Sequence, residues 1–318
     1  MTIYITDYIQ DPDIEKGVLD HKISKNKETA EVLLVWHQAI TKEYLKDFPK
    51  IKGVVRYGVG YDMVDLDAIK ERNIYFCNTP DYGTDEVSDT VIGMLMNIAR
   101  GITQYDHACK RYEDGTWQEN TLPNIKRTSD INFGVIGAGR IGGSILRKAK
   151  AIGFNCYFYD PYKDSGYEKM LGVNRTENQD ELLKIADIIS INTPLTDITR
   201  GMVDENFISN MKTGASFINA ARGEIVSDID IFIDPIKNCK LSSIALDVLP
   251  QEPPNNSTLI SSWKNNEEWI SGKVIINPHT SYFSDKAYIE MRTSAAMNAK
   301  KIIEGKIPKN IIVTKADD

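Results

Sequence analysis

Three ionisable residues follow strand-like segments in the second half of this chain, and together their side chains could transfer a proton beside a bound acid. Arg222, Glu252 and His279 each come within a few residues of the end of such a segment. In an open parallel sheet, ligands bind outside the carboxyl ends of the strands, so groups distant in sequence can meet there. We therefore expect these three side chains to converge.

An arginine, a histidine and a glutamate supply what the reduction of a 2-oxo acid requires. A guanidinium offers a planar fork to a carboxylate, and an imidazole can give a proton to the developing alkoxide. A carboxylate bonded to the imidazole orients the ring and favours its charged form. On this hypothesis Arg222 holds the substrate, His279 is the acid-base residue and Glu252 is its partner. Each also has a simpler interpretation: a surface cation at a strand end, a turn residue after Pro278, and a solvated loop acid before Pro253.

A glycine-rich segment, Gly137-Ala138-Gly139-Arg140-Ile141-Gly142, joins an apolar strand-like run to an amphipathic helix-like stretch. In the GxGxxG pattern the first glycine permits a tight turn, the second lets the backbone approach a pyrophosphate, and the third lets helix and strand pack closely. The helix N-terminus adds amide donors and the positive end of the helix dipole. This setting predicts a dinucleotide site, and the alternative is a glycine turn without a ligand.

Asp160 ends the next predicted strand. A carboxylate at this place accepts hydrogen bonds from a ribose 2′-hydroxyl and repels a 2′-phosphate, which favours NAD over NADP. The alternative is that Asp160 only opens the Asp160-Pro161 turn.

Two series of alternating strands and helices must position these residues. In the first hundred residues, we expect strands at 2–6, 32–36, 53–57 and 74–78, followed by a long helix from Thr84. In the second series, we expect strands at 131–136, 156–159, 188–192, 216–220, 243–248 and 274–277. This second series predicts a doubly wound sheet. An amphipathic helix after Ser284 and an extended segment at 311–313 end the chain.

Length and composition limit the class of protein. A chain of 318 residues fits two domains better than one core. The net charge of −7 includes no basic stripe, which argues against direct nucleic-acid binding. We find neither a secretory signal pattern nor an apolar run of the ~18 to 20 residues that span a bilayer, so we expect no membrane segment and a cytoplasmic location. The four cysteines form no CxxC pair, so no metal site is indicated.

With these motifs in hand, the chain resembles the D-isomer-specific 2-hydroxyacid dehydrogenase family over nearly all of its length. The segments that carry the resemblance are 137–142, Asn219-Ala220-Ala221-Arg222-Gly223-Glu224, Ala245-Leu246-Asp247-Val248 leading to Glu252-Pro253, and Pro278-His279-Thr280. The resemblance implies an α/β protein of two Rossmann-like or flavodoxin-like domains with parallel sheets. Residues 1–99 and 285–318 would form a discontinuous substrate domain, and residues 100–284 the NAD-binding domain. It also implies NAD as cofactor, a small 2-oxo or 2-hydroxy acid as substrate, and a homodimer.

The resemblance also assigns roles to single residues. It makes Arg222, Glu252 and His279 catalytic, and it implies cofactor contacts at Gly137, Gly139, Arg140, Ile141, Gly142, Asp160, Thr193, Ala220, Ala221 and Asp247. The loop Tyr57-Gly58-Val59-Gly60-Tyr61 matches the family's glycine-bearing loop, whose backbone amides meet the substrate carboxylate. The expected substrate contacts are therefore Tyr57, Val59, Gly60, Arg222 and Tyr282, and the alternative is that the loop is only a turn.

The stretch 279–284, with 289–292 after it, is most similar to the branch that contains the C-terminal-binding proteins, which are dehydrogenase-like transcriptional corepressors. In that branch the position of Tyr282 is commonly a tryptophan that faces the substrate. Two further functions stay open: an NAD(H)-sensing binding protein, in which the cofactor fixes domain closure, and a phosphite dehydrogenase with the same residue types. The segment 255–271 is longer than in many relatives, and we assign it no role.

Overall fold

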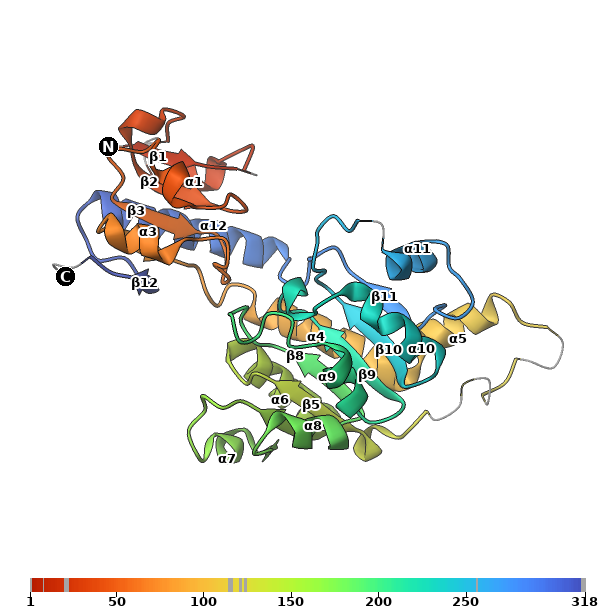
Figure 1. The fold of residues 1–318 in the computed structure, drawn as a ribbon. Helices are drawn as coiled ribbons and strands as arrows, with labels where there is room; N and C mark the ends of the chain where they lie inside the picture. The colour runs from red at the N-terminus through yellow and green to blue at the C-terminus, as the bar shows by residue number, and fades with distance from the viewer. Residues whose placement is uncertain are drawn as a thin grey trace. The chain divides into compact units, whose positions relative to one another are not determined.

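A computed structural model describes residues 2–7, 9–19, 23–113, 117–119, 122, 125–255 and 257–315. The chain divides into two compact units. Unit 1 comprises Met1–Gly83 and Phe283–Asp318, and unit 2 comprises Thr84–Tyr282. The C-terminal piece therefore belongs with the N-terminal strands, which confirms the discontinuous domain that the resemblance implied (Figure 1).

Unit 1 is a five-stranded sheet in the order β1-β2-β3-β4-β12. Strands β1 to β4 are parallel, and β12 runs antiparallel to β4 at the edge. Its strands are β1 (Thr2–Ile5), β2 (Ala30–Val35), β3 (Gly53–Arg56), β4 (Tyr75–Cys77) and β12 (Ile311–Val313). Its helices are α1 (Asp13–Leu19), α2 (Lys42–Leu45), α3 (Leu66–Glu71) and α12 (Asp285–Ile303). The sheet follows the predicted strands closely, because their apolar runs are buried on both faces.

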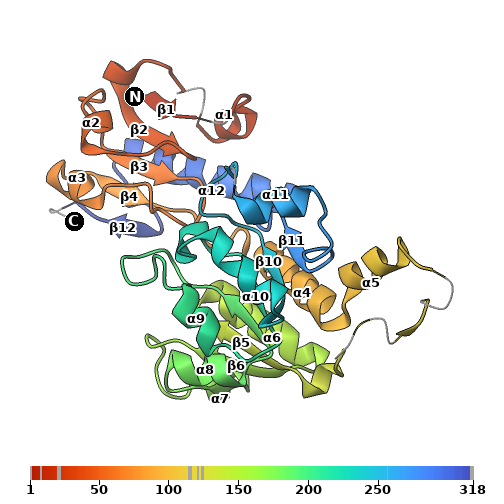
Figure 2. The ribbon, with the colours of Figure 1, turned by 45° about the vertical axis from the view of Figure 1, so that its right-hand side comes forward.

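Helix α12 joins the C-terminal piece to the rest of unit 1. It packs against α1, β2 and β3, and the figures show it beside these strands (Figures 1 and 2). Glu15 on α1 and Arg292 on α12 are both buried, and Arg292 Nε lies 2.8 Å from Glu15 Oε1. Removing one partner of such a pair typically costs about 3–5 kcal/mol, because the other charge stays buried. This pair therefore fixes the C-terminal helix in unit 1.

Unit 2 is a seven-stranded sheet in the order β11-β10-β9-β8-β5-β6-β7, with every pair parallel. Its strands are β5 (Asn132–Ile136), β6 (Asn155–Tyr159), β7 (Asn174–Arg175), β8 (Ile188–Ile191), β9 (Ala215–Asn219), β10 (Leu241–Leu246) and β11 (Val274–Ile276). Its helices are α4 (Thr84–Arg100), α5 (Ile102–Cys109), α6 (Arg140–Ile152), α7 (Tyr167–Leu171), α8 (Gln179–Ile185), α9 (Glu205–Asn210), α10 (Ile233–Lys237) and α11 (Thr258–Lys264). This is the doubly wound order, whose switch point lies between β5 and β8.

The sheet of unit 2 is covered on both faces. Neighbouring residues of β9 show this, since Phe217 packs with α8 to α11 and Ile218 packs with α4 and α6. Successive side chains of a strand point to opposite faces. The hydrophobic cluster around Phe217 therefore lies under one layer of helices, and the cluster around Ile218 lies under the other. The six predicted strands are confirmed, and the two-residue strand β7 is an addition that no apolar run indicated.

The first boundary between the units differs from the predicted domain border. The prediction placed residues 1–99 in the first domain, whereas the contacts divide the chain between Gly83 and Thr84. Val91 and Leu95 of α4 are buried against α6, so this helix packs with unit 2. Lys148 on α6 strengthens the attachment through a 2.7 Å hydrogen bond to Ser88 Oγ.

The segment 255–271 is part of the core of unit 2. Leu259 and Ile260 of α11, together with Ile270, are buried in it. The carboxylate of Asp230 accepts hydrogen bonds from the amides of Thr258 and Leu259 at the start of the helix. The residues described here therefore give the extra length a structural role.

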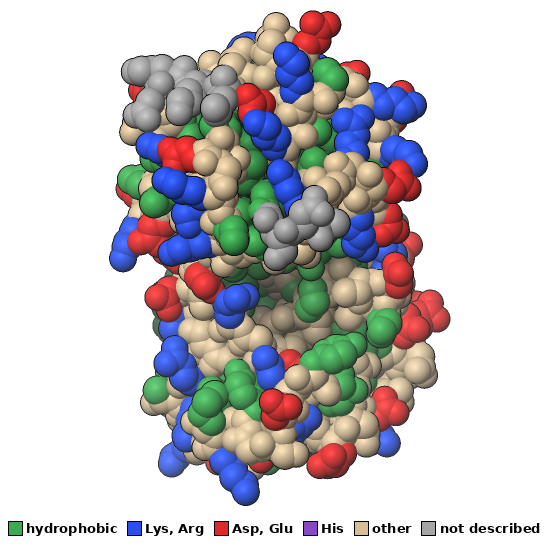
Figure 3. All heavy atoms as spheres, turned by 90° about the vertical axis from the view of Figure 1, so that its left-hand side faces the viewer, with side chains coloured by type: hydrophobic (Ala, Val, Ile, Leu, Met, Phe, Trp, Pro, Cys, Tyr) green, Lys and Arg blue, Asp and Glu red, His purple; other side chains and the backbone are tan. Residues whose placement is uncertain are grey.

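In the ranges that the structure describes, no helix combines the length and apolar character needed to cross a bilayer. On the face drawn in Figure 3, Lys and Arg side chains are interspersed with Asp and Glu. This face shows no continuous basic stripe, the surface feature that binding of duplex nucleic acid requires.

Candidate active site

The three glycines of the fingerprint each have a different steric reason in the structure. Gly137 has φ +89°, and a Cβ there would lie 2.8 Å from Asn192 O. A Cβ on Gly142 would lie 2.0 Å from Gly137 O, so only glycine lets α6 approach the turn. A Cβ on Gly139 would meet nothing within 4 Å. The second glycine therefore keeps open a place at the start of α6, where the pattern requires room for a pyrophosphate.

Asp160 holds the glycine turn from the end of β6. Its Oδ2 accepts the amide of Ala138 at 2.9 Å, and its Oδ1 accepts the amide of Tyr162 at 2.9 Å. The turn interpretation and the ribose prediction are compatible, because each carboxylate oxygen can accept a second hydrogen bond.

The other predicted cofactor contacts lie along the same carboxyl edge of the sheet. Thr193 follows β8, Ala220 and Ala221 lead from β9 to Arg222, and Arg140 and Ile141 open α6. Thr193 Oγ1 is buried and has no hydrogen-bond partner in the described part of the chain. An open place at Gly139 and an unsatisfied hydroxyl are what a site for a dinucleotide should show, so these residues fit NAD.

His279 and Glu252 are in direct contact. His279 Nδ1 lies 2.7 Å from Glu252 Oε2, and Glu252 Oε1 accepts the amide of Leu249 at 2.8 Å. Burial acts to raise the pKa of Glu252, but the hydrogen bond and charge of His279, the Leu249 amide and the charge of Arg222 hold it below its usual range. Glu252 is therefore a carboxylate at neutral pH, and its partners are the two cationic residue types that the sequence predicted.

Arg222, whose charge acts on Glu252, lies on a loop whose close packing requires a glycine at residue 223. Its Nη1 donates to Ala221 O at 2.9 Å, and its own carbonyl accepts from Asn219 Nδ2 at 2.9 Å. A Cβ on the next residue, Gly223, would lie 1.9 Å from Leu249 O. Gly223 thus lets the Arg222 loop pack against the segment that leads to Glu252, a close approach that the sequence pattern did not reveal.

Asp247 braces the loop that carries the histidine. Its side chain is 2% exposed, and it accepts the amides of Thr280 at 3.0 Å and Ser281 at 3.1 Å. The amide of His279, whose φ is +56°, donates to Asp247 O at 2.8 Å. The resemblance implied a cofactor contact here, and the geometry adds that Asp247 positions His279.

The glycine-bearing loop in unit 1 has two amides that no described residue uses. Tyr57 is 1% exposed, and its hydroxyl donates to Glu15 Oε1 at 2.9 Å. Its amide donates to Val35 O at 2.8 Å, so Tyr57 serves the core of unit 1. The amides of Val59 and Gly60 donate to no residue in the described ranges. The amides of Val59 and Gly60 are therefore suited to bind a substrate carboxylate. Tyr57 is not, because its hydroxyl and its amide already donate hydrogen bonds within unit 1.

Tyr282, the other expected substrate contact, is half-buried at the end of unit 2. For metals, no group of three or more His, Cys, Asp or Glu residues within the described ranges could hold an ion.

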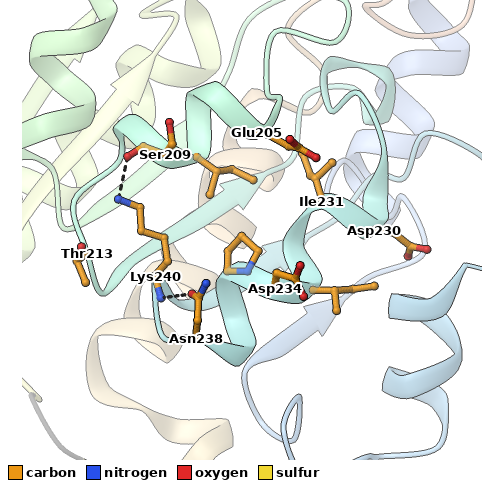
Figure 4. A pocket seen from close by; sticks show the side chains of 11 residues that line it. Glu205, Ser209, Thr213, Asp230, Ile231, Asp234, Asn238 and Lys240 are labelled. Atoms are coloured by element: carbon orange, nitrogen blue, oxygen red, sulfur yellow. Dashed lines mark hydrogen bonds between the residues drawn. The ribbon is translucent and has the colours of Figure 1, made fainter.

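A wide pocket of about 750 Å³ lies on unit 2 at the other edge of its sheet. Two of its lining residues, Thr213 and Lys240, stand just before β9 and β10, whereas the residues above follow the carboxyl ends of strands. Figure 4 shows Lys240 turned toward Ser209, whose carbonyl oxygen lies 2.9 Å from Lys240 Nζ. The ammonium group of Lys240 thus already donates hydrogen bonds to backbone oxygens. We assign the pocket no ligand.

The doubly wound sheet, the glycine turn at its carboxyl edge and the contact between His279 and Glu252 are together typical of a dinucleotide-dependent oxidoreductase. The sequence profile described as D-isomer specific 2-hydroxyacid dehydrogenase, NAD binding domain, matches residues 92–281. This is more than half of the chain, so the chain belongs to the D-isomer specific 2-hydroxyacid dehydrogenase family. It is an oxidoreductase of the CH–OH group with NAD as cofactor.

Individual relatives span nearly the whole chain. The D-3-phosphoglycerate dehydrogenase of Methanocaldococcus jannaschii is 30% identical over 98% of this chain, which spans 57% of that relative's length. The glyoxylate reductase of Korarchaeum cryptofilum is 28% identical over 91% of this chain and 84% of its own. The crystal structure of D-lactate dehydrogenase from Aquifex aeolicus, complexed with NAD and lactic acid, has a TM-score of 0.86 and 26% identity, and covers 98% of this chain and 99% of that one. These relatives do not support the prediction that the chain lies closest to the C-terminal-binding proteins.

Proposed function

We propose that this chain is an NAD-dependent D-2-hydroxyacid dehydrogenase that interconverts a small 2-oxo acid and its 2-hydroxy acid. The observation that carries the proposal is the 2.7 Å contact between His279 Nδ1 and Glu252 Oε2, with the charge of Arg222 acting on the same carboxyl group. Although the Glu252 side chain is 37% exposed, it is therefore not a loop acid without partners.

The atoms of this pair divide the chemical roles. Because Nδ1 of His279 is held by Glu252, Nε2 is the ring atom left to give a proton to the substrate oxygen in reduction, or to take one in oxidation. Arg222 binds the carboxylate and the polarised carbonyl oxygen. The bound cofactor supplies or accepts the hydride at C2.

The substrate class follows from charge and from the relatives. Arg222 and the amides of Val59 and Gly60 all favour a carboxylate. Glyoxylate and lactic acid, which are named for two relatives, are both small carboxylic acids with an oxygen on C2. Unit 1 would act as the substrate domain and unit 2 as the NAD domain, and Tyr282 would shape the pocket around the group on C2. The homodimer and the cytoplasmic location stay predictions.

The test is the oxidation of NADH, followed optically, with glyoxylate, pyruvate, hydroxypyruvate and longer or aromatic 2-oxo acids. We expect turnover of at least one acid. Reduction of NAD by phosphite, without turnover of any 2-oxo acid, would instead support a phosphite dehydrogenase. If NADH binds and changes self-association but no acid is turned over, the sensing function replaces the enzyme.

A further inference from the structure

The two residues that follow β4 hold the glycine-bearing loop after β3 by its carbonyl groups. The carbonyl oxygen of Gly58 accepts the amide of Thr79 at 3.1 Å, and the carbonyl oxygen of Val59 accepts Asn78 Nδ2 at 2.8 Å. Asn78 and Thr79 are both buried. The carbonyl side of the loop is therefore tied to the carboxyl end of β4.

These two hydrogen bonds also set the direction of the amides that a substrate would meet. A trans peptide unit is planar, so its carbonyl and its N–H point in opposite directions. The Gly58 carbonyl and the Val59 amide share one such unit, and the Val59 carbonyl and the Gly60 amide share the next; both units are trans. Since both carbonyls point at the residues after β4, both amides point away from them, and no residue in the described ranges accepts these amides.

We propose that Asn78 is a positioning residue for the substrate carboxylate, because its side chain fixes the peptide unit that carries the Gly60 amide. This rests on the proposed function, in which the amides of Val59 and Gly60 bind that carboxylate. Asn78 is itself anchored, since its own amide donates to Asn310 O at 3.3 Å. A hydrogen bond weakens steeply as it departs from a linear arrangement, so a peptide unit that can rotate binds the carboxylate less tightly.

The experiment measures the KM for an acid that the wild-type protein reduces, together with kcat and the Kd for NADH. In Asn78→Ala the KM should rise about three- to tenfold, the effect of one ordinary hydrogen bond. The kcat should stay near the wild-type value, because the carboxylate is bound equally in the ground state and in the transition state. The Kd for NADH should not change. The inhibition constant of oxamate, an unreactive analogue with a carboxylate next to a carbonyl carbon, should rise by the same factor as the KM.

A matched control is an asparagine that holds a backbone carbonyl away from the site. Asn132, at the start of β5, donates from Nδ2 to Ile185 O at 3.1 Å. Both Asn78→Ala and Asn132→Ala should lower the Tm, but only Asn78→Ala should raise the KM for the acid. If Asn78→Ala does not fold, Asn78→Ser carries the same test, because its hydroxyl is too short to reach the Val59 carbonyl but leaves a polar group in the buried site.

Two results would overturn the proposal. One is a wild-type KM and a wild-type oxamate inhibition constant in a folded Asn78 variant. The other is an equal loss of acid and NADH affinity, which would show that Asn78 supports the whole chain and not the carboxylate site. Failure of the proposed function would instead be the absence of turnover in the wild-type protein.

Discussion

Each unit has a loop at the carboxyl edge of its sheet that an aspartate holds in the same way. In each sheet an aspartate at the carboxyl end of one strand accepts backbone amides from the loop after the neighbouring strand. In unit 1, Asp7 accepts the amides of Trp36 at 3.1 Å and His37 at 2.7 Å. In unit 2, Asp247 accepts the amides of residues 280 and 281. These hydrogen bonds fix each loop to the end of the neighbouring strand.

The units differ in what these braced edges leave unused. In unit 2, the edge carries the contact between His279 and Glu252, the side chain of Arg222, and the buried hydroxyls of Thr193 and Ser281, which pair with no residue in the described ranges. In unit 1, the amides of Tyr57 and Gly58 in the loop after β3 already donate hydrogen bonds. The neutral amides of Val59 and Gly60 in the same loop donate to no residue that the structure describes. Changes in unit 2 should therefore alter kcat and NADH binding, whereas changes at the edge of unit 1 should alter the KM for the acid.

The largest effect should come from the histidine of unit 2. His279→Asn removes the proton donor and should lower kcat by about 10²- to 10⁴-fold while NADH affinity stays nearly unchanged. Steady-state kinetics and NADH titration measure the two quantities. The matched control is His37→Asn in unit 1, which should retain kcat. Turnover near wild type in His279→Asn would remove this residue from proton transfer.

Local sequence patterns predicted the parts of this division that depend on short spacings. The glycine turn, the strands and the strand-end positions of the ionisable residues follow from periodicity and from the rule that ligands bind at carboxyl ends. The packing of Gly223 against Leu249 did not, since it joins segments that no local pattern relates. For the same reason the sequence placed α4 in the wrong unit, because only its contact with α6 decides this.

The bracing role of Asp247 also lay beyond the sequence. An aspartate after a strand suits either a cofactor contact or a backbone brace, and its two acceptor oxygens look the same in both roles. Its burial and the amides that it accepts establish the bracing role.

An intermediate effect should come from exchanging the bracing aspartates for asparagine. This isosteric change turns one acceptor oxygen into a donor, so each loop loses part of its support. In Asp247→Asn, we expect kcat to fall about tenfold or more, because misplacing a catalytic group by a small distance has a large cost. Asp7→Asn should loosen the loop at Trp36, whose ring centroid lies 5.4 Å from that of Tyr57 at the start of the β3 loop. The KM for the acid should therefore rise, and NADH affinity should not change.

The pair of variants can also contradict the comparison. If Asp247→Asn weakens NADH binding and leaves kcat intact, Asp247 is a cofactor contact and not a brace. If Asp7→Asn lowers kcat as much as Asp247→Asn does, the sheet edge of unit 1 does not act on substrate binding alone, and the proposed division between the two units is wrong. Stopped-flow measurement of NADH binding distinguishes a loss of cofactor affinity from a loss of kcat, which steady-state kinetics measures.

The smallest effect should be a shift in pH dependence on replacing Glu252 with glutamine, which keeps the side-chain shape but removes the charge. Reduction needs a protonated imidazole, and the carboxylate 2.7 Å away favours that form. In Glu252→Gln the pH profile of kcat for reduction should therefore differ from the wild-type profile on its alkaline side.

The pKa of Glu252 determines where the wild-type pair operates. Burial raises this pKa, but the contacts with His279, Leu249 and Arg222 bring it below the ordinary value of 4.5. A carboxyl group with a lowered pKa stays charged above the ordinary value and loses its charge only as the pH falls through the lowered one. Any decline of wild-type activity above pH 4.5 therefore belongs to another group. The control is Glu205→Gln, which changes a glutamate in the pocket of about 750 Å³ at the other edge of the sheet and should keep the wild-type pH profile. If the pH profile of Glu252→Gln also superimposes on that of the wild type, the Glu252 carboxylate does not act on His279.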